Sequence, residues 1–311
     1  MTATARTARD RATDGLTAWM YRAAWAAVRS APGTPVHRLA DGLADVAWRR
    51  RGSAVVQFAR NQRRVLGYGG RTVTPAELSE VTRAGLRSYA RYWVETFRLP
   101  SMDHDAVVAR VVAGTTGLEH VDAAHAAGRG SVMVLPHSGN WDVGGLMMTR
   151  RYGRLTTVAE RLRPEQLYEQ FLAYRESLGM EILPLTGGPA PSGVLKDRLR
   201  AGGIVCLVGD RDLSAGGVPV TFFGEEARMP AGPALLAALT GADLCPAHLS
   251  FTPTGWRTVI HPPIPLPGTR LAEKVASATQ AIADRFAADI ATRPADWHML
   301  QPLFTADLTP R

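Results

Sequence analysis

The 311-residue sequence contains little lysine, little cysteine and no long uncharged apolar run. Its only lysines are Lys196 and Lys274, so arginine carries nearly all of the positive charge. Cys206 and Cys245 each lie within an apolar stretch, which favours buried free thiols in a reducing compartment over a disulfide framework or a cysteine-based zinc site. Because the sequence shows no secretory signal and no run of about 18 uncharged apolar residues, we expect no segment to span a bilayer.

Positive charge is concentrated in the first third of the chain. Residues 1–100 contain 17 Arg against 7 Asp and Glu, whereas residues 101–311 contain 19 Lys and Arg against 21 Asp and Glu. This asymmetry indicates an anionic partner for the N-terminal part, either a membrane surface or a nucleic acid. A genome-wide preference for arginine is the alternative explanation.

Three amphipathic helices are expected in this basic region, over 16–29, 36–48 and 53–66, because apolar residues recur there at intervals of three or four. Two interpretations of the region are open, and they are compatible with each other. One is a helical layer packed on the main domain with solvated arginines. The other is an interfacial platform in which Trp19 and Trp25 enter the lipid headgroups while arginines meet lipid phosphates. The apolar repeat of the second helix consists of Val36, Leu39, Leu43, Val46 and Ala47, and the polar side of the third carries Arg60, Arg63 and Arg64.

The remainder of the sequence predicts an α/β fold. A long helix is expected from the capping sequence Thr74-Pro75-Ala76-Glu77 to Pro100, and from residue 131 onward short apolar strands alternate with helices. This order is typical of a central, mostly parallel or mixed sheet covered by helices on both faces. The expected strands are 131–136, 154–159, 180–184, 203–208, 243–250 and 256–261, and the expected helices between and after them are 141–151, 164–178, 190–201, 230–240 and 271–292.

We expect residues 1–14 to form a disordered tail and residues 15–311 to form a single domain. Within that domain, 15–100 is the basic amphipathic helical layer and 101–311 is the α/β core that carries the candidate chemistry.

A histidine and a carboxylate stand five residues apart in the stretch PHSGNWD, at 136–142, directly after an apolar strand. Five residues of continuous helix turn by about 500°, so His137 and Asp142 would lie on different faces if both were helical. We therefore expect a helix that begins at Trp141 with Asn140 as its cap and with Asp142 in its first turn. The Asp142 carboxylate is then predicted to accept a hydrogen bond from one ring nitrogen of His137, leaving the other nitrogen free as a general base.

A second charged group, Asp210-Arg211-Asp212, follows another apolar strand. Because open α/β sheets bind ligands at the carboxyl ends of their strands, we expect these side chains near His137. Asp210 is predicted to be a second acidic partner of the histidine, with Glu225 as an alternative. Arg211 is expected to stabilise an oxyanion or to bind a phosphate.

Several stretches resemble the lipid A late-acyltransferase family in the same order along the chain. The pattern His-x4-Asp at 137–142 is similar to the signature of glycerolipid acyltransferases. The segments 131–142, 205–212, 219–224 and 229–250 resemble the lipid A late acyltransferases, and AERLRPE and FLAYRESLGMEILPL, at 159–165 and 171–185, most resemble the actinobacterial branch, the phosphatidylinositol mannoside acyltransferases. The similarity extends over about residues 15–305.

The resemblance implies an O-acyltransferase that moves a palmitoyl-like group from acyl-CoA to a mannose hydroxyl of a phosphatidylinositol mannoside. His137 would deprotonate the hydroxyl, which attacks the thioester directly; the absence of a Gly-x-Ser-x-Gly nucleophile elbow from the sequence agrees with this. Acyl-CoA is then a co-substrate, and no cofactor or metal is implied. Such an enzyme is expected to bind an anionic membrane at the cytoplasmic face of the plasma membrane, and not nucleic acid.

The resemblance and the local sequence also suggest which residues bind the substrates. Glu160 is expected to bond sugar hydroxyls, with Arg161 and Arg175 near the acceptor. Phe222 and Phe223 are expected in the wall of the acyl pocket. The list is completed by Arg228, which precedes a helix start able to hold a phosphate, and by Asn140 and Gly144 at a helix start that another group approaches closely.

Three alternatives are kept. The first is acylation of another glycolipid or of a lysophospholipid, with acyl carrier protein as an alternative donor. The second is a metal-dependent glycosyltransferase in which Asp210-x-Asp212 clamps a cation, although no Gly-rich nucleotide loop accompanies it. The third is a nucleic-acid-binding module that uses the basic helices.

Overall fold

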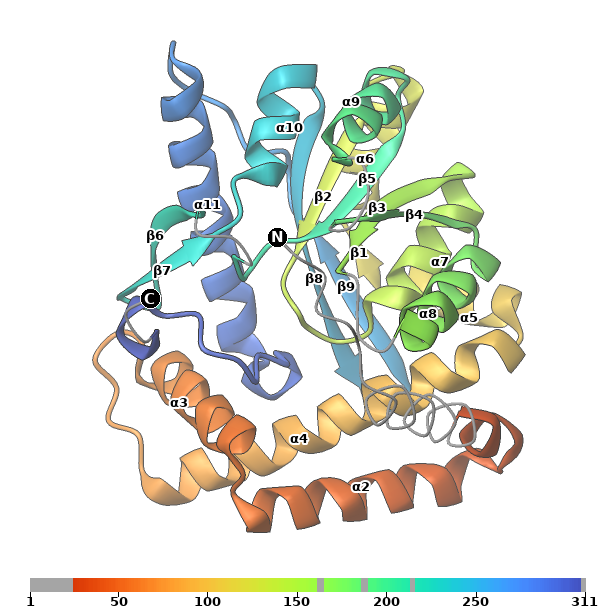
Figure 1. Cartoon of the computed structure of the whole chain (residues 1–311), viewed down its shortest axis with the longest axis vertical. Coiled ribbons are helices and arrows are strands. Elements are labelled where there is room, and N and C mark those ends of the chain that lie inside the picture. Colours follow the sequence, from red (N-terminus) through yellow and green to blue (C-terminus); the bar gives the residue numbers. More distant parts are fainter. Residues whose placement is uncertain (1–24, 161–164, 186–189, 213–215, 309–311) are drawn as a thin grey trace, which may run out of the picture.

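A computed structural model of the chain describes residues 25–160, 165–185, 190–212 and 216–308. It contains a seven-stranded sheet with helices on both faces and a layer of helices across one end (Figure 1). The strand order is β1-β9-β8-β2-β5-β3-β4. The strands are β1 (Thr115–Thr116), β2 (Ser131–Leu135), β3 (Leu155–Ala159), β4 (Met180–Pro184), β5 (Ile204–Val208), β8 (Asp243–Thr252) and β9 (Gly255–Ile260).

The five strands from β8 to β4 are parallel, and the antiparallel β9 with its partner β1 extends one edge. The central strand β2 pairs with β5 in a register that sets Leu135 opposite Val208. Two residues beyond this pair, the same register sets His137 beside Asp210. The sheet therefore brings together two polar residues that are 73 positions apart in the sequence.

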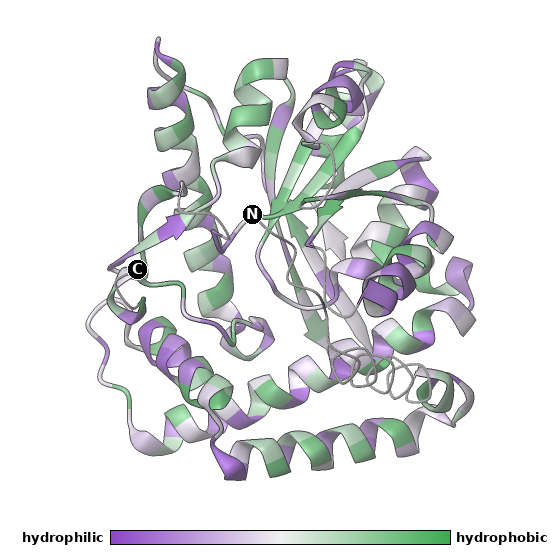
Figure 2. Cartoon of the chain, viewed as in Figure 1, coloured by the Kyte–Doolittle hydropathy of each residue, from purple (hydrophilic) through white to green (hydrophobic). Residues whose placement is uncertain are grey.

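The two faces of the sheet are covered by different helices because side chains alternate along each strand. Val132 and Val134 of β2 belong to one apolar core and Met133 belongs to the other. In Figure 2 the central strands β2 and β5 are green, because apolar side chains point to both faces; β2 is buried on both. The first core is covered by α9 (Ser192–Arg200), α10 (Gly232–Thr240) and α11 (Leu271–Thr292), and the second by α5 (His104–Ala113), α6 (Leu118–Ala126), α7 (Trp141–Tyr152) and α8 (Glu165–Ser177).

The N-terminal helices α2 (Gly33–Arg50), α3 (Ser53–Gly67) and α4 (Pro75–Arg98) form the layer at one end. Figure 1 shows α4 crossing the end of the sheet toward which the arrow of β8 points, with α2 packed along its outer side. The start of α4 is fixed by a capping box between Thr74 and Glu77 with proline at the next position, as the sequence predicts. This layer sets α4 against the carboxyl ends of the parallel strands.

The expected α/β architecture is confirmed, and the expected strands and helices that fall on described residues lie within a few residues of the observed ones. The helix expected at 16–29 lies mostly outside the described residues. The sequence patterns did not reveal the antiparallel hairpin of β6 (Val218–Phe222) and β7 (Glu225–Met229), nor the short elements α5, α6 and β1. The predicted tail at 1–14 lies outside the described residues, and the single-domain boundaries stay a prediction. None of the helices in the described part of the chain is long and apolar enough to cross a bilayer. Both thiols are free, with Cys245 buried and Cys206 half-buried.

Two predictions about the basic region are wrong. Trp25 does not reach outward: it is 7% exposed and packs on Phe97, with ring centroids 4.8 Å apart, and on Phe171 at 5.5 Å. Arg64 is not a solvated arginine, because Asp307 and Glu225 pair with its guanidinium at 2.6 and 2.8 Å. Amphipathic spacing shows that a helix has two sides, but it does not show which partners meet each side. Trp19 lies outside the described residues.

Candidate active site

The site centres on His137, which follows β2, and Asp210, which follows β5. Nδ1 of the imidazole lies 2.6 Å from Oδ1 of the carboxylate. The His137 backbone N–H donates to Oδ2 at 2.9 Å, and Nε1–H of Trp297 donates to the same oxygen at 2.8 Å. Because Oδ1 accepts from Nδ1–H, the neutral ring keeps a free lone pair on Nε2.

Asp210 is completely buried, so its charge depends on these donors. Burial alone would raise the pKa of Asp210, but the charge of His137 and the hydrogen bonds from His137 and Trp297 outweigh it and lower the pKa below its usual value. The carboxylate therefore stays ionised at neutral pH and stabilises an imidazolium on His137. Asp210 is the acid that pairs with the histidine, as predicted for a second partner. Glu225, the alternative, is paired with Arg64 instead.

The predicted hydrogen bond between Asp142 and His137 is wrong. Asp142 does stand in the first turn of α7, but its carboxylate accepts from Nε of Arg175 at 2.8 Å and from the hydroxyl of Tyr92 at 3.3 Å. The physical reason is the direction of the first turn of α7, which faces α4 and α8, whereas the β2–β5 register delivers Asp210 to the ring. Asp142 and Arg175 thus form a buried ion pair in the wall of the site.

Asn140 and Gly144 serve the helix start and not a substrate, contrary to the prediction. Asn140 is fully buried; its Oδ1 accepts from the Val143 N–H at 3.2 Å and its Nδ2 donates to Glu95 at 2.9 Å. A Cβ on Gly144 would lie 2.8 Å from the side chain of Leu249. The close approach that the glycine predicts is confirmed, but the approaching group belongs to the protein core.

The loop between β2 and α7 is held from two sides. Gly139 has a φ of 58°, and a Cβ on it would lie 2.7 Å from the Leu249 carbonyl, so only glycine fits. Its N–H donates to the carbonyl of Asp296 at 3.0 Å, and His298 N–H donates to the carbonyl of His137 at 2.7 Å. The segment 296–298 therefore fixes the backbone of the histidine loop.

A cavity of about 350 Å³ opens beside His137, whose side chain is 37% exposed. Its walls are mainly aromatic and aliphatic, with a smaller number of polar side chains among them. Of the residues predicted to bind substrate, Glu160, Arg175 and Arg211 line it. The apolar lining comprises Tyr89, Tyr92, Trp93, Trp141, Val158, Ala159, Tyr168, Phe171, Leu172, Ile182, Leu185 and Val208, and the remaining polar groups are His298 and Gln301.

The other predicted substrate-binding residues do not line this cavity. Phe222 and Phe223 are buried on the opposite side of Trp297, with ring centroids 5.8 and 6.0 Å from the indole, so they support the donor to Asp210 and are not part of this cavity wall. Arg228 lies in β7 and donates to the Gly217 carbonyl at 2.9 Å. Arg161 lies outside the described residues.

Three buried residues of the site were not predicted: Glu95, Trp297 and His298. Glu95 on α4 accepts from Arg91, Asn140 and Trp256 at 2.7, 2.9 and 2.7 Å and ties α4 to the start of α7. Trp297 and His298 follow the last long helix in the sequence Ala-Asp-Trp-His. The sequence signal that could have indicated these two site residues is a tryptophan and a histidine beside an aspartate, in a stretch without helical or strand periodicity.

Buried histidines give the fold a pH dependence. Burial lowers the pKa of His298 to about 3 and that of His248 on β8 to about 4. Between these values and about 6.5 the unfolded chain binds protons that the folded chain excludes, so stability falls as the pH falls. Relative to wild type, we expect His248→Gln to flatten the slope of the unfolding free energy by about 1 kcal/mol per pH unit between pH 6 and 4.5, measured by urea unfolding. Parallel slopes for the two proteins would contradict the assignment.

The two carboxylates of the Asp210-x-Asp212 pattern face different surroundings. Asp210 is occupied by His137 and Trp297, whereas Asp212 accepts from the Gly217 N–H at 2.9 Å. Within the described ranges no three His, Cys, Asp or Glu side chains are grouped as metal ligands. The geometry at Asp210 therefore does not match a paired carboxylate clamp.

The paired histidine, the apolar walls and the polar lining side chains suit acid–base chemistry on a ligand that has an apolar and a polar part. Fold and site together define an α/β enzyme with its site at the carboxyl ends of the parallel strands. The chain belongs to the bacterial lipid A biosynthesis acyltransferase family, whose model matches residues 4–306. It is accordingly an acyltransferase, as the sequence resemblance predicts.

Three relatives are similar over most of their length. Two sequences from Mycobacterium tuberculosis, strains CDC 1551 / Oshkosh and ATCC 25618 / H37Rv, are each 48% identical over 303 residues, which is 97% of this chain and 92% of the relative. A sequence from Mycolicibacterium smegmatis, strain ATCC 700084 / mc(2)155, is 47% identical over 293 residues, 93% of this chain and 91% of the relative. All three are named phosphatidylinositol mannoside acyltransferase.

Proposed function

We propose that the enzyme transfers a fatty acyl group, palmitoyl or similar, from acyl-CoA to a mannose hydroxyl of a phosphatidylinositol mannoside. The observation that carries this proposal is the free Nε2 of His137, beside a largely apolar cavity and backed by the buried Asp210 carboxylate. The names of the three relatives, at 47–48% identity over nearly the whole chain, support the choice of acceptor.

The proposed reaction proceeds by direct attack. The acceptor O–H gives its proton to Nε2 of His137 while its oxygen forms a bond to the thioester carbonyl carbon. The resulting imidazolium is stabilised by Asp210, which accepts from Nδ1–H. When the tetrahedral intermediate collapses, the C–S bond breaks and the leaving sulfur takes the proton from Nε2. The products are the acylated sugar and free coenzyme A, and the histidine returns to its neutral form.

Different lining residues of the cavity suit different parts of the two substrates. The aromatic and aliphatic walls suit an acyl chain, and Glu160 at the rim suits sugar hydroxyls. Arg211 lines the same cavity and is proposed to stabilise the thioester oxyanion or to bind a phosphate. Nε–H of Arg175 already donates a hydrogen bond to Asp142, so only the remaining N–H groups of the guanidinium can bind an acceptor phosphate.

Product analysis tests this function. Purified enzyme, palmitoyl-CoA and a phosphatidylinositol mannoside are expected to give one new lipid heavier by a palmitoyl group, with an equal amount of free coenzyme A. Activity that survives EDTA is also expected. If product forms from a lysophospholipid or another glycolipid but not from the mannoside, the proposed acceptor is wrong. If the acyl group is transferred only from acyl carrier protein, the proposed donor is wrong.

We further propose that the N-terminal layer binds an anionic membrane, at the cytoplasmic face of the plasma membrane where acyl-CoA is available. The predicted apolar repeat of α2 is largely not packed inward: Leu39 and Leu43 are 65% and 62% exposed, and Val46 is 39% exposed. In Figure 2 this outer helix is banded green and purple. Apolar residues that face outward beside arginines are typical of an interfacial helix.

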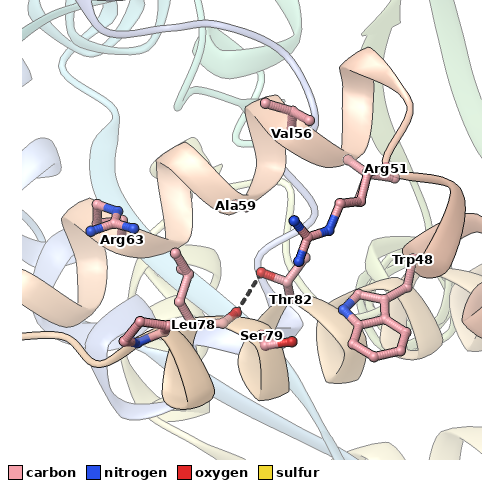
Figure 3. A pocket seen from close by; sticks show the side chains of 10 residues that line it. Trp48, Arg51, Val56, Ala59, Arg63, Leu78, Ser79 and Thr82 are labelled. Atoms are coloured by element: carbon pink, nitrogen blue, oxygen red, sulfur yellow. Dashed lines mark hydrogen bonds between the residues drawn. The ribbon is translucent and has the colours of Figure 1, made fainter.

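Exposed arginines lie at the end of α2 and beyond it. Arg49 and Arg50 end α2, and Arg51 and Arg63 flank a cleft of about 310 Å³ between α2, α3 and α4. Figure 3 shows the Arg51 side chain extending over Thr82, with Arg63 at the other end of the cleft. The positive charge of these arginines attracts the phosphate groups of anionic lipids.

Replacing Leu39 and Leu43 together with glutamate is expected to weaken binding to vesicles of phosphatidylcholine and phosphatidylinositol at least about tenfold, because two apolar side chains no longer enter the interface. Vesicle co-sedimentation measures this. Leu239→Glu on α10, where Leu239 is 44% exposed, is the matched control and should bind like wild type. Equal losses in both variants would reject this membrane face, and binding to duplex DNA in preference to vesicles would favour a nucleic-acid module.

A further inference from the structure

A second histidine, His298, stands next to the proposed base. The residues 296–298 run beside the histidine loop: Ser138 and Trp297 form an antiparallel bridge, and His298 N–H donates to the His137 carbonyl. Along this segment the side chains alternate in direction. Trp297 bonds Asp210, whereas His298 lies against the aromatic residues of α4, with its ring centroid 5.3 Å from that of Tyr89.

The ring of His298 is held by a chain of hydrogen bonds that sets its tautomer. The Ser88 hydroxyl donates to Oδ1 of Asp296 at 2.7 Å, and Oδ2 of Asp296 accepts from the Phe251 N–H at 2.9 Å. Nε2 of His298 lies 2.9 Å from the Ser88 oxygen. Because the single hydrogen of Ser88 is given to Asp296, Nε2 must carry the hydrogen that bonds the Ser88 oxygen. Nδ1 of His298 is then an acceptor.

This acceptor has no partner in the described part of the chain. Nδ1 of His298 is buried and makes no hydrogen bond with the described residues. The residue is 4% exposed and lines the same cavity as His137. A buried polar atom without a partner is unfavourable, so a ligand that supplies the missing hydrogen bond binds more tightly. Burial and the charge of His137 lower the pKa of His298 to about 3, which keeps Nδ1 unprotonated at neutral pH.

We propose that Nδ1 of His298 accepts a hydrogen bond from a second hydroxyl of the acceptor, next to the hydroxyl that His137 deprotonates. His298 is a positioning and specificity residue: it does not take the reacting proton. It makes the site prefer an acceptor with neighbouring hydroxyl groups, such as a sugar, over a simple alcohol. The proposal rests on the proposed transfer to a sugar hydroxyl.

Matched variants separate the two ring nitrogens. His298→Gln places an amide near the position of Nε2 and keeps a donor for Ser88, but it has no group at the position of Nδ1. His298→Asn places its amide oxygen near the position of Nδ1 and keeps an acceptor there. His248→Gln is the control. His248 is also a buried histidine whose Nε2 has no hydrogen-bond partner among the described residues, and it does not line the cavity.

The test measures kcat and KM for octyl α-mannoside and for its monodeoxy analogues. We expect His298→Gln to lose roughly 10- to 100-fold in kcat/KM on the mannoside, mainly through KM, and less than about threefold on the one analogue that lacks the bonded hydroxyl. His298→Asn should keep the discrimination against that analogue, and His248→Gln should behave like wild type.

Two failures are distinguishable. If wild-type enzyme acylates neither the mannoside nor a phosphatidylinositol mannoside, the proposed function fails and the hydroxyl assignment with it. If wild type acylates them but His298→Gln loses the same factor on every analogue, or loses nothing, the assignment of Nδ1 alone is overturned.

Discussion

Replacing Asp210 with asparagine is expected to lower kcat by about 10²–10⁴-fold. The carboxylate accepts from Nδ1–H of His137 at 2.6 Å and thereby keeps the lone pair on Nε2. An asparagine amide can donate to Nδ1 and so favours the opposite tautomer, in which Nε2 carries the hydrogen and is no longer a base. It also removes the charge that stabilises the imidazolium. The initial rate of thiol release from palmitoyl-CoA in the presence of acceptor measures the effect.

Glu225→Gln is the matched control for this variant. Glu225 is an acid from the same part of the sequence, but it is 44% exposed at its side chain and pairs with Arg64 at the surface of the hairpin. We expect its kcat within about twofold of wild type, because surface ion pairs contribute little. If Asp210→Asn kept wild-type activity, or if Glu225→Gln lost as much as Asp210→Asn, the pairing of His137 with Asp210 would not be the catalytic one.

Replacing Arg175 with methionine is expected to destabilise the fold by about 3–5 kcal/mol, because it leaves the Asp142 carboxylate buried without its positive partner. Asp142 and Arg175 side chains are only 2% and 19% exposed, and Tyr92 is the neighbouring donor. Urea unfolding of the variant and of wild type at pH 7 measures the difference. The double variant Asp142→Asn with Arg175→Met should recover most of the loss, since no unpaired charge remains.

The half-buried pair of Arg198 and Glu181 provides the comparison. Its Nη2 and Oε1 atoms lie 2.7 Å apart, but the two side chains are 37% and 26% exposed. Arg198→Met is therefore expected to cost less than about 1 kcal/mol. Equal losses for Arg175→Met and Arg198→Met would mean that the Asp142 pair is not the buried structural bridge described above.

The fold was predictable because its elements are marked by local signals. Apolar runs of about five residues set the strands, and Thr74-Pro75 and Asn140 set the starts of two helices through their caps. The hairpin of β6 and β7 carries weaker signals: Pro219 interrupts one strand, and Glu225 and Glu226 begin the other. Its strands are held by pairing with each other and by Phe222 in the core, which local spacing does not reveal.

The site was predictable only in part, because its geometry depends on contacts between distant segments. His137 is marked by its position directly after a buried strand, but its partner is chosen by the register of β2 against β5. Nearness along the chain favoured Asp142, which the first turn of α7 directs to Arg175. Trp297 and His298 reach the site from the far end of the sequence through backbone bonds to the histidine loop. No sequence period encodes such contacts.

The role of His137 as the base can be measured most directly through the rate of acyl transfer by His137→Ala with palmitoyl-CoA and purified phosphatidylinositol mannoside. The variant should fold, because the ring is partly exposed at the cavity. Thermal unfolding of the variant can verify this. We expect its rate to fall by about 10²–10⁴-fold. A folded variant that transfers the acyl group within about tenfold of the wild-type rate would show that another group takes the proton.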